Sequence, residues 1–471
     1  MQQHKQQLQQ HELIGRYYLE HYPYTLMHKW LQAAAGVREF GDRKEQAVFS
    51  FFTKDNRWIR YLCFGTATKW RRQASELTNS VVSRMEVGGT FSTLPAVDKQ
   101  LIQSLGLKPS ACELRFDVDI DDYQELRKDY CSCAAKEICA VCWTFLACAV
   151  ETLEYMLREY FGFQHILFVF SGRRGVHCWV CDPCVQYLTA KERERIHAVL
   201  SQVLVAENLQ DTSSSARGGS GIIISISSIK KKKKQQPLTV AGHVNHLLEQ
   251  VFWKGYKLLK RQQETRDKPA FQTSLPDCAS RLNVQQKISV AQTMRLRLDS
   301  KVTCDPSHPM KLPFCVHPST GYVAIPIDPT RVYDFRLSEV PCVLPKQHQQ
   351  QQYSFEEALQ EHFSAFRALF FDNFYDSVVL HSETSSDSDE YEDDDNSCSS
   401  ISSNSSSSSL TTGHSRNHAR RRRRRYDSSR SSSSSNSCSM TNSTTTGSSS
   451  SSSNSNNSSS SSSSCSTSSD V

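Results

Sequence analysis

Two aspartates set two residues apart in an extended run are the side chains of this sequence best suited to chemistry. They are Asp117 and Asp119, in the segment ELRFDVDIDD at residues 113–122. Because the side chains of a strand alternate between its faces, both carboxylates point to the side opposite Val118. Like charges held side by side repel unless a cation neutralises them, and Mg²⁺ and Mn²⁺ prefer oxygen ligands. The spacing therefore favours a metal site for phosphoryl transfer, with an edge strand of solvated acidic residues as the alternative.

A basic turn lies further along the chain, between two segments that read as buried strands. The strands are expected at residues 165–170 and 176–180, and the turn between them is SGRRG, residues 171–175. Glycines allow tight turning and close approach of a ligand, and guanidinium groups match phosphate oxygens. The alternative is a solvated turn beside a histidine of the core. Because the polar residues converge next to a candidate metal strand, the sequence favours a triphosphate cradle formed by Ser171, Arg173, Arg174 and His177.

Four cysteines fall between these two motifs, with the spacing C-x-C-x5-C-x2-C. They are Cys131, Cys133, Cys139 and Cys142. Thiolates at this density bind zinc tetrahedrally, and four sulfurs leave no open position for catalysis. Buried reduced thiols that gather by chance are the alternative, since the chain holds 17 cysteines. The spacing predicts a structural zinc knuckle over residues 131–142.

The three motifs, in this order, resemble the small catalytic subunit of eukaryotic-type DNA primase. Residues 171–182 read SGRRGVHCWVCD, which matches the family motif throughout. Residues 297–299 (RLD) resemble the segment of the third family carboxylate, and residues 311–321 (KLPFCVHPSTG) resemble its nucleotide-binding segment. The resemblance covers residues 10 to 345, with patchy agreement from 185 to 285.

This resemblance implies a function, a fold and a set of site residues. The activity would be synthesis of short RNA primers from NTPs on a single-stranded DNA template, by two-metal phosphoryl transfer. Partners would be a large iron-sulfur primase subunit and the DNA polymerase alpha complex, with no membrane, and the location would be the nucleus. Arg60 would assist near the nucleotide. Two Mg²⁺ or Mn²⁺ ions would be held by Asp117, Asp119 and Asp299, and the triphosphate by Ser171, Arg173, Arg174, His177, Lys311 and His317.

The chain also departs from the family motifs at several positions. Ser132 separates two zinc cysteines that are adjacent in the family, residues 41–46 look like an insertion, and Glu86 falls where the family tends to have a ribose-contacting aspartate. Asp299 stands alone in its segment, with Asp305 as a nearby competitor for the third carboxylate.

Composition divides the chain into a part that can fold and a part that cannot. Of 471 residues, those at 381–471 are almost entirely Ser, Asn, Thr, Asp and Glu around a block of six arginines at 420–425. Such a tail has too little apolar surface to offset the entropy of ordering. We therefore expect a catalytic domain over residues 1–380, folded until about Phe374, and a disordered Ser-rich tail over 381–471. The arginine block, and a lysine run at 230–234 in what looks like an inserted loop, would be localisation signals, nucleic-acid patches or solubilising charge.

The remaining composition bounds the class of protein. No secretory signal is visible in the glutamine-rich N-terminal segment, and no run is expected to approach the ~20 apolar residues of a membrane span. Seventeen cysteines in a reducing compartment argue for metal binding and packing over disulfides.

The periodicity of apolar residues predicts an α+β fold with a mixed or antiparallel sheet and a helical insert at about 186–285. The zinc knuckle predicted from the cysteine spacing belongs to the same domain. The resemblance implies that this is the primase catalytic fold. Expected helices cover residues 10–34, 136–160, 188–208, 240–262 and 354–370, and expected strands cover 47–53, 57–63, 113–120, 165–170, 176–180 and 322–326.

Two other functions share part of this evidence. A primase-polymerase that extends primers or bypasses lesions with dNTPs would use the same metal and phosphate chemistry. A noncatalytic zinc protein that binds nucleic acid through basic runs is the other, but acidic groups facing a phosphate backbone would weaken its binding.

Overall fold

The computed structural model describes the greater part of residues 2–384. The described residues are 2–34, 46–53, 55, 57–76, 82–91, 104, 108–131, 133, 138–202, 240–266, 275–345 and 354–384. All of them belong to one compact unit, residues 1–392. Ser132, the insertion apart from Gln46, the lysine run, the arginine block and the tail beyond Thr384 lie outside the described residues.

One of the two sheets in the described part of the chain takes three strands from residues 46–91 and a fourth from residues 310–311. It contains β1 (Gln46–Thr53), β2 (Trp58–Leu62), β3 (Val82–Phe91) and β7 (Met310–Lys311) in the order β2-β1-β3-β7. All three pairings are antiparallel, and β7 reaches the sheet through the pair Glu86 and Lys311. The strands β1 and β2 match the predicted ones, whereas β3 and β7 were not predicted.

The second sheet carries the aspartates and the basic turn. Its strands are β4 (Leu114–Asp119), β6 (Gly175–Val180), β5 (Ile166–Phe170) and β8 (Pro326–Ile327), in the order β4-β6-β5-β8 and all antiparallel. Every residue of β5 and β6 is buried. The predicted strand at 322–326 is wrong in its bounds, because residues 322 and 323 form only isolated bridges and β8 begins at Pro326.

A buried arginine joins the two sheets. Arg115, on β4, donates hydrogen bonds to the carbonyl oxygens of Val87 and Gly88 on β3, both at 2.9 Å, and to the carboxylate of Glu113. Its side chain is 1% exposed. Since a buried charge is tolerated only when it is paired and hydrogen-bonded, these bonds fix how β4 meets β3.

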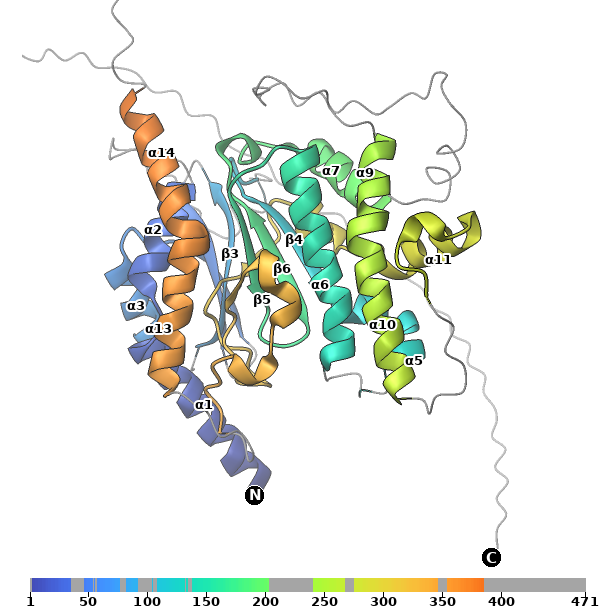
Figure 1. Cartoon of the computed structure of the whole chain (residues 1–471). Coiled ribbons are helices and arrows are strands. Elements are labelled where there is room, and N and C mark those ends of the chain that lie inside the picture. The colour runs from blue at the N-terminus through green and yellow to red at the C-terminus, as the bar shows by residue number, and fades with distance from the viewer. Residues whose placement is uncertain are drawn as a thin grey trace, which may run out of the picture. The chain divides into compact units, whose positions relative to one another are not determined.

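Helices flank the second sheet on both sides, as Figure 1 shows. On one side lie α6 (Ala140–Tyr155), continued by the π-helical turn η3 (Met156–Tyr160), and α10 (Trp253–Arg266). On the other lie α13 (Phe355–Phe366) and α14 (Asp372–Thr384), joined by the turn η10 (Arg367–Phe371). The mixed α+β class with antiparallel sheets is therefore confirmed.

The remaining helices complete this unit. They are α1 (Gln2–Glu20), α2 (Tyr24–Ala34), α3 (Ala67–Glu76), η2 (Ile120–Tyr123), α5 (Gln124–Tyr130), η4 (Pro183–Val185), α7 (Ala190–Gln202), α9 (Val240–His246), η6 (Leu247–Phe252), η7 (Ala279–Arg281), α11 (Val284–Met294), α12 (Ser300–Cys304), η8 (Pro329–Asp334) and η9 (Leu337–Glu339).

Two helix predictions were wrong in their bounds. The single helix expected at 10–34 is two helices, because Pro23 lacks an amide donor and disfavours helical backbone at Tyr22. The folded part does not end near Phe374, since α14 continues to Thr384. The capping box of Ser354 and Glu357 starts α13 at the expected place.

The expectation about apolar runs also needs correction. Among the described residues, the helix Ala140–Tyr160 is long and apolar enough to cross a membrane, with a mean hydropathy of 1.4 over its most apolar window. However, 72% of that window is buried inside the protein. Trp143, Leu146 and Val150 belong to the core, so packing against the sheet accounts for the composition of this helix.

Candidate functional site

A polar cavity of about 230 Å³ lies where the two sheets approach each other. We call it the central pocket. Acidic and basic side chains both line it, and they come from β3, β4, β6 and β7, the turns beside these strands and the segment that contains His317. Its lining comprises Arg84, Glu86, Asp117, Asp119, Ser171, Arg173, Arg174, His177, Val302, His308, Pro309, Met310, Lys311 and His317.

The carboxylates gather at the end of β4. Asp117 pairs with His177 across β4 and β6, and Asp119 pairs with Gly175. Asp299 does not line the pocket, but its backbone N–H donates to the carbonyl oxygen of Asp117 at 3.1 Å. Asp305, the competing candidate, instead lines a neighbouring cavity. The chain thus brings Asp299 to the Asp117 strand and leaves Asp305 away from it.

Electrostatics confirm that these carboxylates interact. Burial, and then the charges of Asp119 and Asp299, raise the pKa of Asp117 to about 7. Burial and the same two charges also raise the pKa of Asp122, which sequence reasoning did not single out. Such mutual repulsion is what a bound divalent cation relieves.

The side chains of Asp119 and Asp299 also hold the backbone of the residues that follow them in place. Asp119 Oδ1 accepts from the N–H of Asp121 at 2.9 Å, and Asp299 Oδ1 accepts from the N–H of Lys301 at 2.8 Å. Each residue is therefore the N-cap of the short helix that follows it. Because one carboxylate oxygen is engaged by the cap, the orientation of each side chain is fixed and its other oxygen can serve as a ligand.

The wall formed by β6, β7 and the basic turn carries cationic and neutral groups. Lys311 Nζ donates to the carbonyl oxygen of Ser171, and burial lowers the pKa of Lys311 to about 8. Burial and the charge of Lys311 lower the pKa of His177 to about 3, and the same causes act on His317, whose pKa also falls to about 3. Both imidazoles are thus neutral at pH 7, and the positive charge of this wall comes from lysine and arginine.

The basic turn adopts a conformation that depends on glycine. Gly172 has a φ of +84°, and a Cβ there would lie 2.9 Å from the carbonyl oxygen of Tyr322. Ser171 Oγ accepts from the N–H of Gly175 at 3.0 Å, and Thr320 Oγ1 donates to the carbonyl oxygen of Gly172 at 2.7 Å. These bonds hold the turn against the segment that supplies His317.

The two arginines of the turn have different surroundings. Arg174 Nη1 donates to Asp121 Oδ1 at 2.8 Å, and its second nitrogen pairs with the other oxygen of that carboxylate. Arg173 lines the pocket and is in no ion pair among the described residues. The predicted cradle therefore contains one arginine that is oriented by a carboxylate and one that is available to an anion.

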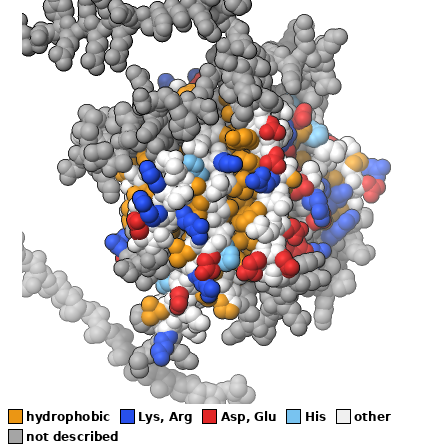
Figure 2. Space-filling model, turned by 90° about the vertical axis from the view of Figure 1, so that its left-hand side faces the viewer, with side chains coloured by type: hydrophobic (Ala, Val, Ile, Leu, Met, Phe, Trp, Pro, Cys, Tyr) orange, Lys and Arg blue, Asp and Glu red, His pale blue; other side chains and the backbone are white. Residues whose placement is uncertain are grey.

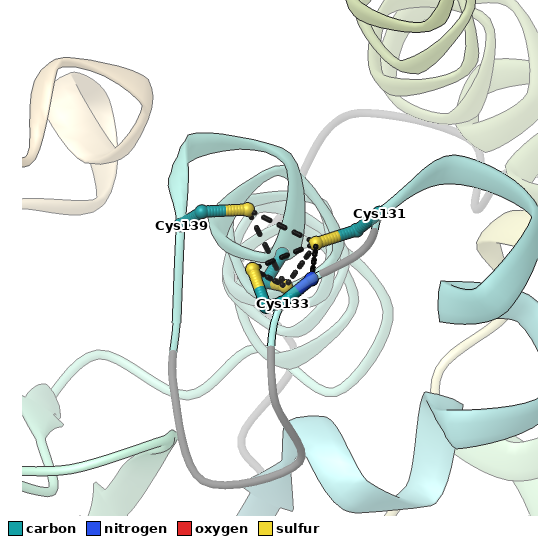
Figure 3. A group of neighbouring side chains, drawn as sticks. Cys131, Cys133 and Cys139 are labelled. Carbon is teal, nitrogen blue, oxygen red and sulfur yellow. Dashed lines mark hydrogen bonds between the residues drawn. The ribbon is translucent and has the colours of Figure 1, made fainter.

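The four cysteines meet at the start of α6. Their Sγ atoms lie within 4.8 Å of one another, and those of Cys133 and Cys139 are each 3.7 Å from that of Cys142. Figure 3 shows the sulfurs pointing toward one another from the end of α5 and the beginning of α6. Sulfurs that share one zinc ion at ~2.3 Å lie about 3.8 Å apart, so this group could hold zinc.

The surroundings favour a thiolate at Cys139, whereas burial raises the pKa of Cys133 and a hydrogen bond with Cys139 raises the pKa of Cys142. A hydrogen bond from Cys142 lowers the pKa of Cys139 to about 4. Although burial acts to lower the pKa of Arg127, the adjacent Cys142 raises it, which places a firmly charged cation beside the sulfurs. A positive neighbour offsets the negative charge of a tetrathiolate site.

Comparison with known proteins identifies the family. A family model described as "DNA primase small subunit" matches residues 116–329. The DNA primase small subunit of Schizosaccharomyces pombe is 30% identical over 365 residues, which are 70% of this chain and 76% of that protein. This chain belongs to the DNA primase small subunit family. The relatives from Drosophila melanogaster and Saccharomyces cerevisiae are 28% and 27% identical, over 72% and 66% of this chain and 81% and 80% of their own lengths.

In this primase small subunit, most of the residues that line the central pocket lie within the matched region. Residues 116–329 contain the aspartates, the cysteines, the basic turn and the segment with Lys311 and His317. Arg84 and Glu86 lie outside that region, on β3, and reach the pocket because Glu86 pairs with Lys311. Arg84 was missed by sequence reasoning, and its Nε lies 2.8 Å from Glu86 Oε1. To find Arg84 from the sequence, β3 would first have had to be predicted as a strand.

Arg60, like Asp299, is a predicted site residue that does not line the central pocket. It lines a second cavity, which shares Pro309 with the central pocket. Its guanidinium lies 4.1 Å from the centre of the Trp58 ring, and its charge lowers the pKa of Glu86, which burial raises.

Proposed function

We propose that this primase small subunit synthesises short RNA primers from NTPs on single-stranded DNA, by two-metal phosphoryl transfer. The observation that supports this function is the central pocket itself. Asp117 and Asp119 line it together with cations that a triphosphate would require, and the charge of Asp299 acts on Asp117 from nearby. A protein that only binds nucleic acid has no use for such repelling carboxylates at its binding surface.

Asp117, Asp119 and Asp299 would hold two Mg²⁺ or Mn²⁺ ions. Their oxygen-only donor set, and the raised pKa of Asp117, fit hard divalent cations. Bound there, the ions would activate the 3′-hydroxyl of the primer and neutralise the leaving pyrophosphate.

The basic residues would bind and orient the triphosphate. Arg173 and Lys311 would offset its negative charge, and Arg174, oriented by Asp121, would present a fixed fork of donors. The neutral imidazoles of His177 and His317 would each donate one hydrogen bond to a phosphate oxygen. Ser171 would line the cradle through its hydroxyl, and Arg60 would act beside it from the second cavity.

The decisive test is an incorporation assay on a single-stranded template with labelled NTPs, with and without Mg²⁺ or Mn²⁺. Metal-dependent, template-directed RNA synthesis is expected. Tight binding of the template without any incorporation would instead indicate a noncatalytic nucleic-acid-binding protein.

A primase-polymerase that uses dNTPs is the second candidate, because Glu86 stands where a ribose-contacting aspartate is expected. The matched relatives, all named DNA primase small subunits, do not favour it. Incorporation of NTPs and dNTPs should be compared at equal concentrations. A preference for dNTPs would contradict the assignment to primer RNA synthesis.

The name small subunit also suggests partners. We propose a large iron-sulfur subunit and the DNA polymerase alpha complex as partners, and the nucleus as the location. Because this chain offers one triphosphate cradle among its described residues, we expect it to extend a preformed RNA primer and to start new primers poorly. Addition of the large subunit should restore initiation, and efficient dinucleotide synthesis by the chain alone would contradict this division of labour.

A further inference from the structure

A second cavity, larger than the central pocket, lies beside it. Its volume is about 800 Å³, and Pro309 lines both cavities. The strand β3 also runs along both, with Glu86 in the central pocket and Gly88 in the second cavity. A ligand in the second cavity would therefore lie next to a nucleotide held in the central pocket.

An unpaired donor lines this cavity. The side-chain nitrogen Nε2 of Gln186 is buried and has no hydrogen-bond partner among the described residues, and the residue is 5% exposed. A buried amide without a partner is unfavourable, because it has given up its hydrogen bonds to water without gaining others. Such a donor is typical of a site where a ligand supplies the missing acceptor.

Two tyrosines provide flat apolar surfaces at the same cavity. Tyr187 is 68% exposed, so a face of its ring is accessible at the cavity. Tyr61 has a φ of +64°, a backbone conformation that is unfavourable for residues with a side chain. Strain of this kind clusters at functional sites, where it fixes the direction of a side chain.

The charged groups of the cavity fit a strand with isolated phosphates better than a triphosphate. Arg60 lies over the rings of Trp58 and Tyr61, at 4.1 and 5.2 Å from their centres, and Lys108 is an exposed residue of the lining. Arg193 is already bonded to four carbonyl oxygens, and Asp305 accepts from Ser307. Two available cations flank the rings, which is too few to neutralise a second triphosphate.

We propose that the second cavity binds one or two bases of single-stranded template DNA. The bases would stack on Tyr187 and Tyr61, with a base oxygen or ring nitrogen accepting from Gln186, while Arg60 and Lys108 contact the flanking phosphates. The proposal rests on the proposed function, since the strand would enter the central pocket opposite the incoming nucleotide. On the face in Figure 2, acidic and basic side chains are interspersed and form no broad basic field.

Binding of a fluorescent single-stranded DNA to the full-length protein, followed by anisotropy without NTP, tests this site. We expect Tyr187→Ala to weaken binding about 5- to 150-fold, the range of one lost base-stacking contact. Gln186→Leu should weaken it by several-fold without lowering Tm, since it removes the unpaired donor. Leu369→Ala, at another exposed apolar residue, is the matched control and should bind like the wild type.

Further measurements separate this site from the central pocket. Binding of Mn²⁺ and NTP should be unchanged in both variants, and a photoreactive base in the DNA should cross-link to the peptide that contains Tyr187. Unchanged DNA affinity in Tyr187→Ala and Gln186→Leu would overturn the proposal, as would loss of affinity for an RNA of the same sequence but not for the DNA. If the DNA effects appear and no incorporation occurs, the proposed function fails while the binding site stands.

Discussion

The backbone N–H of Asp299 donates a 3.1 Å hydrogen bond to the carbonyl oxygen of Asp117. This bond brings a residue that precedes α12 alongside a strand formed much earlier in the chain. The third carboxylate is thereby positioned by the backbone, and its side chain is oriented by its cap on Lys301. The metal chemistry proposed for this protein depends on that junction.

Substitution of the carboxylates should separate catalysis from folding. We expect Asp117→Ala or Asp119→Ala to reduce NTP incorporation by more than about 100-fold, since even residues that only support a metal ligand contribute 10- to 100-fold. Zinc content and the circular dichroism spectrum should stay unchanged. Asp277→Ala, at an exposed carboxylate that lines neither cavity, is the control for incorporation on a preformed primer. Near-normal primer yield from both aspartate variants would exclude the two-metal assignment.

Metal affinity should depend on pH near neutrality. Burial raises the pKa of Asp117 to about 7, so the free protein holds a proton there below that pH, and the proton must leave before a metal binds. Affinity for Mn²⁺ should therefore rise between pH 6 and 8, as titration calorimetry would measure. Because the folded-state pKa is raised, ionisation of Asp117 destabilises the metal-free protein, which should lose stability as the pH rises from about 4 to 7. In Asp117→Asn both trends should be reduced, and an unchanged pH dependence would assign them to other groups.

Removal of zinc should unfold the knuckle. We expect one zinc per chain, and Cys139→Ser or Cys142→Ser should lower both the zinc content and Tm, because binding of structural zinc contributes on the order of 10 kcal/mol to small modules. Cys278→Ser, at a cysteine outside the cluster, is the control. A well-folded wild-type protein without zinc in metal analysis would contradict the assignment.

Gly172→Ala should damage the cradle without touching its polar groups. The φ of +84° and the 2.9 Å approach to the Tyr322 carbonyl leave no room for a Cβ. We expect a loss of about 1–3 kcal/mol in stability and a raised KM for NTP. Gly162→Ala is a useful comparison, because that glycine has a φ of +80° but nothing within 4 Å of the added atom. If both variants keep the wild-type KM, the shape of the turn does not determine nucleotide binding.

Deletion of residues 385–471 should leave primer extension nearly unchanged. The composition of this segment predicts no core, and α14 ends at Thr384, so a cut there spares the helix. Turnover should be measured at matched ionic strength, because the segment carries a block of arginines. A large loss of activity would show that the tail belongs to the template path or the active site.

The sequence alone was enough for features that depend on local geometry. A period of two puts Asp117 and Asp119 on one face of β4, the glycines of the basic turn permit its backbone, and the spacing of the four cysteines lets their sulfurs meet. Each of these features depends on residues within about a dozen positions of one another, so propensity and spacing predict them.

The tertiary structure decided which distant segments share a site. Lys311 and Arg84 reach the central pocket through the pairing of β7 with β3 and through a strand that periodicity did not predict, and Asp299 is held next to Asp117 by a backbone bond to β4. Arg60 was expected near the nucleotide and lies in the second cavity, because β2 is the edge strand of its sheet. Long-range pairing and burial of this kind are set by the packing of the whole core, which no local pattern of residues encodes.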